Sequence, residues 1–508
     1  MTKMKAVDVL VIGGGVNGTG IARDLSGRGL SVMLCEKNDL ASATSSASTK
    51  LIHGGLRYLE HGEFSLVREA LIEREVLLRA APHIIWPMTF VLPYHKKLRP
   101  WWLIRIGLFI YDHLGGLKLL SPSKGMSFAG TKIGQPLKPI FKRGFYYADC
   151  CVDDARLVVL NALDAYEKGA QILPRTECTA LAPHPKEEGW VATLHDSINE
   201  SNFKVHAQLV VNASGPWVNQ VLGLVGSGVE KYKLRWVKGT HIIVPRIYQG
   251  DHAYILQNED KRVVFAIPYE HKYTLIGTTE SEYTGDLEEV RSDMKEVEYL
   301  CAAVNHYFRH QIKPSDVAWT YSGVRPLLDD GVQDASSVTR GYMLDVEEYH
   351  GARMLNVYGG KITTFRKLSE QAGDKIVALL GRGQGAWTAT EAIPGGDGSA
   401  ANFTTFFKTL RREYSWMPEP LTYRYARSYG ARCREFLRGF RRMSDLGEHL
   451  GDDVYEIEVT YLVNVEWALT MEDILWRRSK LGLHISEETE KNIKKLLKKI
   501  LTKKDTSD

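Results

Sequence analysis

Residues 7–36 read VDVLVIGGGVNGTGIARDLSGRGLSVMLCE, and this stretch predicts how the fold begins. The first six residues, 7–12, are an apolar run that suits a buried parallel strand. Three glycines follow at once, and residues 16–29 carry apolar side chains on one helical face. Residues 31–35 form a second apolar run that ends at Glu36. The order strand, glycine turn, helix, strand, acid is typical of a dinucleotide-binding unit.

Within the glycine turn, Gly13, Gly15 and Gly18 form a GxGxxG pattern. The first glycine permits a tight turn, the second lets the backbone approach a pyrophosphate, and the third lets helix and strand pack closely. The helix N-terminus offers N–H groups to phosphates, and Glu36 can accept hydrogen bonds from a ribose. A plain glycine turn can show the same pattern, and the motif alone does not separate FAD from NAD. Its place at the start of the sequence favours FAD.

A loop of small hydroxyl residues follows the acid, since residues 41–56 read ASATSSASTKLIHGGL. On composition alone this is a flexible serine-rich loop. Because it comes directly after the predicted ribose acid, its hydroxyl and backbone donors are also suited to a phosphate or a flavin ring.

Residues 8–37 and 45–64 resemble the FAD-dependent glycerol-3-phosphate dehydrogenases, a family of respiratory enzymes. The resemblance runs from about residue 7 to 485, with Ser214 and Phe365 as mild departures where Thr and Tyr are usual. It implies bound FAD and the oxidation of glycerol 3-phosphate to dihydroxyacetone phosphate. Further matching blocks are VDDARLV at 152–158, LVVNASGPWV at 209–218, KGTHIIVP at 238–245, IGTTE at 276–280, WTYSGVRPL at 319–327, GGKITTFRKL at 359–368 and LWRRSKLGL at 475–483.

Two later strand–turn–helix segments also suit a flavin dinucleotide. Apolar residues 209–212 precede an Ala-Ser-Gly turn, and apolar residues 354–358 precede Gly-Gly-Lys at a helix start. Glycines at a helix N-terminus suit an anion or the pyrimidine end of a flavin, although an ordinary strand–helix connection looks the same. The resemblance places the second turn against the flavin ring. The residues expected to bind the cofactor are Gly13, Gly15, Asn17, Gly18, Glu36, Lys37, Thr44, Ser45, Ser46, Ser48, Lys50, Leu51, Ala213, Gly215, Gly360, Lys361, Ile362 and Thr363.

A phosphorylated substrate needs cationic donors, among which arginine suits a phosphate best. Arg325 stands in the apolar segment SGVRPL, with no acid within three residues. His241 lies in THIIVP, where a strand histidine is more often an ordinary core residue. The resemblance implies that the substrate pocket is lined by Arg57, Tyr58, His241, Arg325 and Arg340, and we expect Lys361 to join them.

The expected chemistry is removal of the hydroxyl proton by a base while the C2 hydride passes to the flavin. His241, with an ordinary pKa of about 6.5, is the leading candidate for the base, and His53 is the second. We expect Arg325 to stabilise the developing alkoxide, and Arg57 with Arg340 to hold the phosphate.

The flavin segments are far apart in the chain, so the predicted α/β fold is a discontinuous Rossmann-like FAD-binding domain of residues 1–80, 145–225 and 345–393. Residues 81–144 and 226–344 are predicted to form a substrate domain. Its β-branched and aromatic segments indicate an antiparallel sheet. After the linker PGGDGS, residues 400–508 are predicted to be a helical C-terminal domain. The strands expected in the substrate domain are 236–245, 262–268 and 273–279, and the C-terminal helices are 403–410, 423–440, 455–467 and 471–481.

The net charge of +4, from 65 Lys+Arg and 61 Asp+Glu, argues against a bulk nucleic-acid-binding protein. No segment reaches the roughly 18 apolar residues of a spanning helix. Residues 95–118, HKKLRPWWLIRIGLFIYDHLGGLK, place cations and tryptophans beside a short apolar stretch, which suits a membrane surface or a helix packed on the core. The basic segment 424–442 suits anionic lipid, a solvated helix face or a dimer surface. Residues 491–505 are predicted to form a short basic amphipathic helix, for which a membrane role stays open.

The resemblance implies that electrons pass to a membrane quinone, so we expect a peripheral protein on the cytoplasmic face of the cell membrane. The sequence does not decide whether the protein forms a homodimer. The six cysteines show no zinc-site spacing, and no metal is expected. The alternatives are an oxidase that reduces oxygen to peroxide, an amine or amino-acid oxidase of the same superfamily, and a catalytically inactive flavin-binding scaffold.

Overall fold

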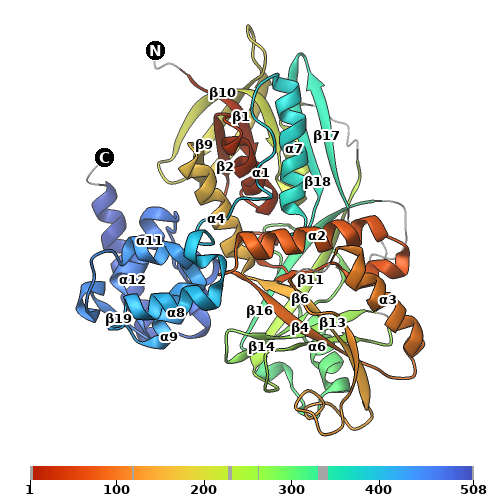
Figure 1. The fold of residues 1–508 in the computed structure, drawn as a ribbon. Coiled ribbons are helices and arrows are strands. Elements are labelled where there is room, and N and C mark those ends of the chain that lie inside the picture. Colours follow the sequence, from red (N-terminus) through yellow and green to blue (C-terminus); the bar gives the residue numbers. More distant parts are fainter. Residues whose placement is uncertain (1–3, 117–118, 227–231, 261, 330–340, 506–508) are drawn as a thin grey trace.

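The structure is a computed structural model that describes residues 4–116, 119–226, 232–260, 262–329 and 341–505. Two sheets stack along one axis, and a helical unit lies to one side of them (Figure 1). Among the described helices, none has both the length and the apolar character needed to cross a bilayer.

The first sheet grows around β1, the strand predicted at the N-terminus. β1 pairs in parallel with β2 on one side and with β10 on the other. Its residues 7–12 are all buried, as expected for a strand covered on both faces. The sheet order is β17-β18-β10-β1-β2-β7, with β8 and β9 attached through β10. The strands are β1 (Lys5–Ile12), β2 (Val32–Glu36), β7 (Gln171–Pro174), β8 (Thr176–Pro183), β9 (Trp190–Asp196), β10 (Ser201–Asn212), β17 (Tyr342–Tyr349) and β18 (Ala352–Gly359).

Helices pack on this sheet and on one another. The helix after the glycine turn, α1 (Val16–Gly27), contacts both α4 (Asp154–Glu167) and α7 (Phe365–Leu380). The short α5 (Val218–Gly223) follows β10. Since β10, β18 and β1 come from three separate parts of the chain, the predicted discontinuous Rossmann-like unit is confirmed.

The second sheet is mostly antiparallel and follows the order β15-β11-β14-β13-β12-β4-β6-β3, with β16 beside β11 and β5 beside β6. Helix α6 (Met294–Tyr307) packs on β11, β12, β13 and β14, while α2 (Phe64–Ala80) contacts α3 (Trp101–Leu114). The three predicted strands of this region are present. The strands are β3 (Leu51–Ile52), β4 (Ile85–Pro93), β5 (Lys124–Ser127), β6 (Arg143–Val152), β11 (Leu234–Pro245), β12 (Ala253–Gln257), β13 (Val263–Tyr269), β14 (Tyr273–Gly277), β15 (Ser281–Glu282) and β16 (Trp319–Leu328).

The C-terminal unit is helical, as predicted, and has its own apolar core. The predicted helix 423–440 is wrong, because the chain breaks at Gly430. At this residue φ is +55°, and a Cβ atom would lie 2.0 Å from the carbonyl oxygen of Gly395. The elements are α8 (Phe403–Glu413), α9 (Glu419–Tyr429), α10 (Cys433–Phe436), β19 (His449–Gly451), β20 (Val454–Tyr455), α11 (Glu456–Val465), a π-helix (Asp473–Arg478) and α12 (Glu487–Asp505).

Buried ion pairs fasten the helical unit to the first sheet. Arg156 of α4 pairs with Glu466, and Arg478 pairs with Asp39, which follows β2; all four side chains are at most 1% exposed. A stacked pair, Trp319 on Trp476 with centroids 3.9 Å apart, adds a contact to the second sheet. Breaking ion pairs as buried as these is strongly destabilising, so these contacts fix the helical unit against the two sheets.

Candidate active site

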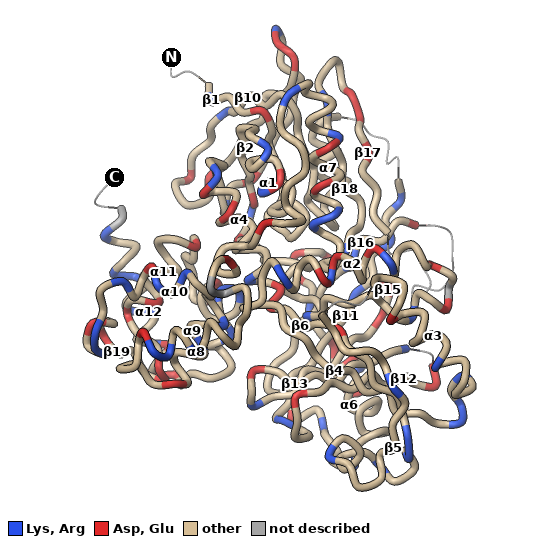
Figure 2. The backbone as a smooth tube through the Cα atoms, viewed as in Figure 1, with Lys and Arg blue, Asp and Glu red and all other residues tan. Residues whose placement is uncertain are grey.

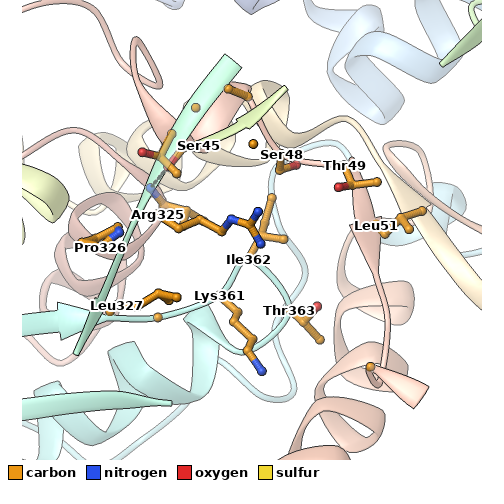
Figure 3. Close-up of a pocket in the computed structure, with 18 of the residues that line it drawn as sticks. Ser45, Ser48, Thr49, Leu51, Arg325, Pro326, Leu327, Lys361, Ile362 and Thr363 are labelled. Carbon is orange, nitrogen blue, oxygen red and sulfur yellow. Dashed lines mark hydrogen bonds between the residues drawn. The ribbon is translucent and has the colours of Figure 1, made fainter. Parts of the chain in front are cut away.

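A cavity of about 810 Å³ lies where the carboxyl ends of β1, β2, β10 and β18 meet the second sheet. Ligands of open α/β sheets bind at this edge. Most of the predicted site residues line it. Figure 3 shows Arg325 of β16 extending across the space toward Ile362. The predicted residues that line the cavity are Gly13, Gly15, Asn17, Glu36, Lys37, Thr44, Ser45, Ser48, Leu51, His53, Arg57, Tyr58, Ala213, Gly215, His241, Arg325, Gly360, Lys361, Ile362 and Thr363.

The glycine turn lines the cavity, and its backbone requires glycine at residues 13 and 18. Gly13 has φ +114°, and a Cβ atom there would lie 2.6 Å from the carbonyl oxygen of Ala213. Gly18 does not line the cavity, but its Cβ would lie 1.9 Å from the carbonyl oxygen of Gly13. It therefore has the packing role that the motif assigns to the third glycine.

Glu36 stabilises the glycine turn itself. Its carboxylate accepts hydrogen bonds from the Gly14 N–H at 2.6 Å and the Asn38 N–H at 2.8 Å. Burial raises the pKa of this carboxyl. Each carboxylate oxygen has a further lone pair, so the predicted contact with a ribose hydroxyl remains compatible with these bonds.

The cavity fits a flavin dinucleotide. The glycine turn at the start of α1 and the Gly360–Thr363 turn both line it. Between them, Asn17 donates to the Gly359 carbonyl at 3.1 Å, while its Oδ1 is buried without a partner in the described part of the chain. A buried polar atom in this state favours a polar ligand nearby.

Besides Gly18, two of the predicted cofactor residues, Ser46 and Lys50, do not line the cavity. Lys50 is 5% exposed and donates to Asp154 at 2.6 Å and to the Ser46 carbonyl at 2.9 Å. Asp154 also accepts from the Ser48 hydroxyl at 2.7 Å. Lys50 and Asp154 therefore stabilise the serine-rich loop without lining the cavity. Asp154 was missed because it is distant in sequence, although it lies within the block VDDARLV.

His241 is 2% exposed and lies against the cavity wall. Its Nε2 is 2.9 Å from the Thr49 hydroxyl, and its ring stacks on Tyr321 with centroids 4.8 Å apart. Burial, followed by the charges of Lys50 and Arg325, lowers the pKa of His241 well below 6.5. The expectation of an ordinary histidine pKa is therefore wrong, because the sequence does not show that two cations face this ring.

Cationic side chains, among them Arg57, Arg325 and Lys361, also line the cavity. Arg57 and Arg325 both face Glu280, with nitrogen–oxygen distances of 3.8 Å and 3.3 Å. The Lys361 ammonium lies 4.0 Å from the centroid of the Tyr58 ring. Glu280 was missed, although it ends the block IGTTE, because its proximity to the arginines arises only in the fold. Arg340 lies outside the described residues.

His53 lies beside the turn expected to meet the flavin ring. Its backbone N–H donates to the Thr363 hydroxyl at 3.3 Å, and its ring packs edge-on to Phe265 at 6.3 Å. His53 and Thr363 both line the cavity. Their hydrogen bond therefore connects the serine-rich loop to the second flavin turn.

An apolar branch of the cavity, which the sequence did not predict, runs toward α3. Its walls come from the segment around Phe64 and from the inner side of α3. Ile106 lines this branch and is also 48% exposed, so the branch reaches the protein surface. Apolar residues of the branch are Leu59, Phe64, Ala70, Leu103, Ile104, Ile106, Leu108 and Ile110.

The three segments predicted as possible lipid-binding surfaces differ in their exposure and ion pairing. On α3, Trp102 and Phe109 are 62% and 54% exposed. In the arginine-rich segment 424–442, by contrast, acids from elsewhere in the chain neutralise most of the charge, and Figure 2 shows red and blue residues interleaved on this unit. The ion pairs are Arg424–Glu458, Arg432–Glu167, Arg434–Glu413 and Arg442–Asp445. In α12 the apolar residues Ile493, Leu496 and Leu497 are buried in the C-terminal core.

Among the described residues, His184, Glu187 and His206 form a group that could hold a metal ion. None of them lines the cavity. The His184 Nδ1 accepts from the Glu187 N–H at 2.9 Å, so the proton of the neutral ring is on Nε2. A nitrogen that carries this proton cannot bind a metal, and we assign no metal site here.

Residues 8–366 match the family described as "FAD dependent oxidoreductase", and residues 386–505 match "C-terminal domain of alpha-glycerophosphate oxidase". A glycerol-3-phosphate dehydrogenase of Pseudomonas aeruginosa is 50% identical, with 94% of this chain and 92% of that protein aligned. The chain belongs to the family of FAD-dependent glycerol-3-phosphate dehydrogenases. The resemblance noted in the sequence is thus confirmed, and FAD is the cofactor of this family.

Two further comparisons refine this placement. D-erythritol 1-phosphate dehydrogenase of Brucella abortus is also 50% identical, covering 96% of this chain and 97% of that protein. The crystal structure of the glycerol-3-phosphate dehydrogenase from Bacillus halodurans with FAD superposes with a TM-score of 0.76, at 24% identity, covering 99% of this chain and 95% of that one. It confirms the fold, including the C-terminal helical unit.

Proposed function

We propose that the protein oxidises the secondary alcohol of glycerol 3-phosphate to the ketone of dihydroxyacetone phosphate, with FAD as the oxidant. The observation that supports this proposal is the composition of the cavity, which is lined both by a dinucleotide cradle and by the cations Arg57, Arg325 and Lys361. Guanidinium groups suit a phosphate, and family membership supplies the cofactor.

Within this cavity the side chains have separate tasks. Bound FAD would accept a hydride from C2 of the substrate. Arg57 and Arg325 would bind the phosphate or the developing alkoxide, which means that Glu280 gives up part of its contact with them when an anion enters. Their partial neutralisation by Glu280 keeps two neighbouring cations in place before the substrate binds.

For the proton acceptor we propose His53 in preference to His241. His241 is fully buried, hydrogen-bonded to Thr49, and faced by two cations that oppose its protonation. A good general base must accept a proton readily near working pH. His241 is better suited to fix the cavity wall as a neutral ring, while His53 lies at the turn Gly360–Thr363.

A second substrate is favoured by one observation, the equal identity of the chain to D-erythritol 1-phosphate dehydrogenase. The same cations and the same hydride acceptor would serve a four-carbon polyol phosphate. Steady-state rates with an artificial electron acceptor decide between the two. We expect kcat/KM for glycerol 3-phosphate to exceed that for D-erythritol 1-phosphate; the reverse order would reassign the substrate, and unphosphorylated glycerol is the control.

For the electrons we propose a membrane quinone as the final acceptor, reached through the apolar branch below α3. The branch joins the flavin end of the cavity to an exposed apolar helix surface, which suits a lipid-soluble molecule. On this proposal the protein is a peripheral membrane protein that docks through α3 on the cytoplasmic face. Stoichiometric peroxide formation in the presence of quinone would support the oxidase alternative instead.

A further inference from the structure

The backbone of His53 and Gly54 is held from two sides. On one side, the His53 N–H donates to the Thr363 hydroxyl at 3.3 Å. On the other, the Gly54 N–H donates to the hydroxyl of Tyr111 at 2.9 Å. Tyr111 is on α3, so a surface helix is hydrogen-bonded directly to the loop that carries the proposed base.

The direction of the hydrogen bonds around Tyr111 is fixed. Its hydroxyl lies 2.9 Å and 2.7 Å from the two carboxylate oxygens of Asp149, which pairs with Arg74 at 2.6 Å. All three side chains are at most 3% exposed. Burial, followed by the charge of Asp149, raises the pKa of Tyr111 well above 10, so the phenol stays protonated. It must give its one proton to Asp149 and offer a lone pair to Gly54.

The loop has little space to relax around this contact. A Cβ atom on Gly54 would lie 2.7 Å from the Tyr111 hydroxyl oxygen and 2.5 Å from Leu71 Cδ2. The next residue, Gly55, has φ +73° and turns the chain into the segment that carries Arg57. A buried hydrogen-bonded network of this kind rigidifies the groups that it contacts.

We propose that Tyr111 is a positioning residue, which sets the orientation of His53 by binding the Gly54 N–H and is itself held by Asp149 and Arg74. This inference rests on the role of His53 in the proposed function. Its physical basis is that proton transfer requires near-ideal geometry, so that a displacement of about 1 Å can lower a rate by about 100-fold.

Tyr111→Phe tests this inference, because it removes the hydroxyl and keeps the ring. Tyr254→Phe is the matched control: that hydroxyl is also buried in the second sheet, but it binds the Ile133 carbonyl outside the cavity. We expect Tyr111→Phe to keep its FAD and to bind substrate within about twofold of wild type, while the limiting rate of anaerobic flavin reduction falls at least about tenfold. The control should stay within about twofold.

The double variant Tyr111→Phe/His53→Gln separates positioning from general damage. If Tyr111 acts through His53, the double variant is no slower than His53→Gln alone, since coupled residues are not additive. A wild-type reduction rate in Tyr111→Phe, or losses that multiply in the double variant, would overturn the inference. A normal rate in His53→Gln would instead remove the proposed role of His53.

If Tyr111→Phe does not hold FAD, Gly54→Ala is the second variant, because its Cβ displaces the phenol of Tyr111. A wild-type rate of flavin reduction in Gly54→Ala would equally overturn the inference.

Discussion

His53 and His241 illustrate what the sequence could and could not predict at the level of residues. Both were named as candidate bases, and both lie at the cavity. We propose the reverse ranking because burial, followed by the charges of Lys50 and Arg325, lowers the pKa of His241 in the folded chain. Motifs locate side chains along the chain, whereas charges that act on them come from distant segments, as with Glu280 and Asp154.

Replacing each histidine by glutamine measures its role directly. General-base catalysis contributes about 100-fold or more, so His53→Gln should lower the limiting rate of flavin reduction by about that factor. His241→Gln should retain a rate within about tenfold of wild type, because a neutral wall residue is replaced by another polar one. Stopped-flow reduction at saturating substrate gives both rates. Equal rates for His53→Gln and wild type, with a large loss in His241→Gln, would restore the original ranking.

Arg325→Ala tests the anion-binding wall. A hydrogen bond to a charged group contributes about 1.5–3 kcal/mol, so KM for a polyol phosphate should rise about 10- to 100-fold. The control Arg262→Ala removes an arginine that is 42% exposed and does not line the cavity. Isothermal titration and steady-state kinetics provide the two readouts. An unchanged KM in Arg325→Ala would place the phosphate elsewhere.

At the scale of elements, the serine-rich loop, the glycine turns and strands such as β1, β11 and β14 follow from local patterns, because periodicity and turn chemistry are local. The helix predicted at 423–440 failed because its break at Gly430 depends on a close contact with Gly395. The sequence of segment 424–442 likewise predicts an unpaired basic surface. In the folded chain, acids from other segments, such as Glu458 and Glu413, pair with its arginines.

Helix α3 is the element for which we expect membrane docking. Replacing Trp102 and Phe109 together by serine removes two large exposed apolar side chains, and binding to vesicles containing anionic lipid should fall at least about tenfold. Ile198→Ser is the control, since Ile198 is also 53% exposed but follows β9 in the first sheet. Vesicle flotation measures the effect. Unchanged flotation of the α3 variant would exclude this helix as the docking surface.

At the scale of the whole molecule, the three-part organisation was predictable from the order of motifs, but the path of the chain between the sheets was not. β3 and all of β6 from residue 145 onward fall within ranges expected for the dinucleotide domain, yet both strands hydrogen-bond into the second sheet. Such pairing depends on non-local contacts, which short-range patterns do not encode.

His83 lies where these units meet, and we expect it to make the stability of the protein depend on pH. It is buried near Gly395 and Gly430, and burial, followed by the charges of Arg156 and Arg427, lowers its pKa from 6.5 to about 3. Because the unfolded chain binds this proton below about pH 6.5 and the folded chain does not, stability is full above that pH and falls toward pH 3.

Between pH 6.5 and pH 5 this one group should cost about 2 kcal/mol of stability. His83→Asn should therefore show a smaller drop of the thermal midpoint from pH 7 to pH 5 than wild type does. The exposed His310→Asn is the control and should keep the wild-type dependence. Identical pH profiles for His83→Asn and wild type would show that His83 does not carry this proton linkage.

On the proposed function, one cavity brings a polyol phosphate to FAD for oxidation. The most direct test is anaerobic mixing of the FAD-loaded protein with glycerol 3-phosphate, while the visible flavin absorbance is followed. We predict that the flavin is bleached and that one equivalent of dihydroxyacetone phosphate forms for each FAD reduced. A flavin that stays oxidised with both glycerol 3-phosphate and D-erythritol 1-phosphate would contradict the proposed function.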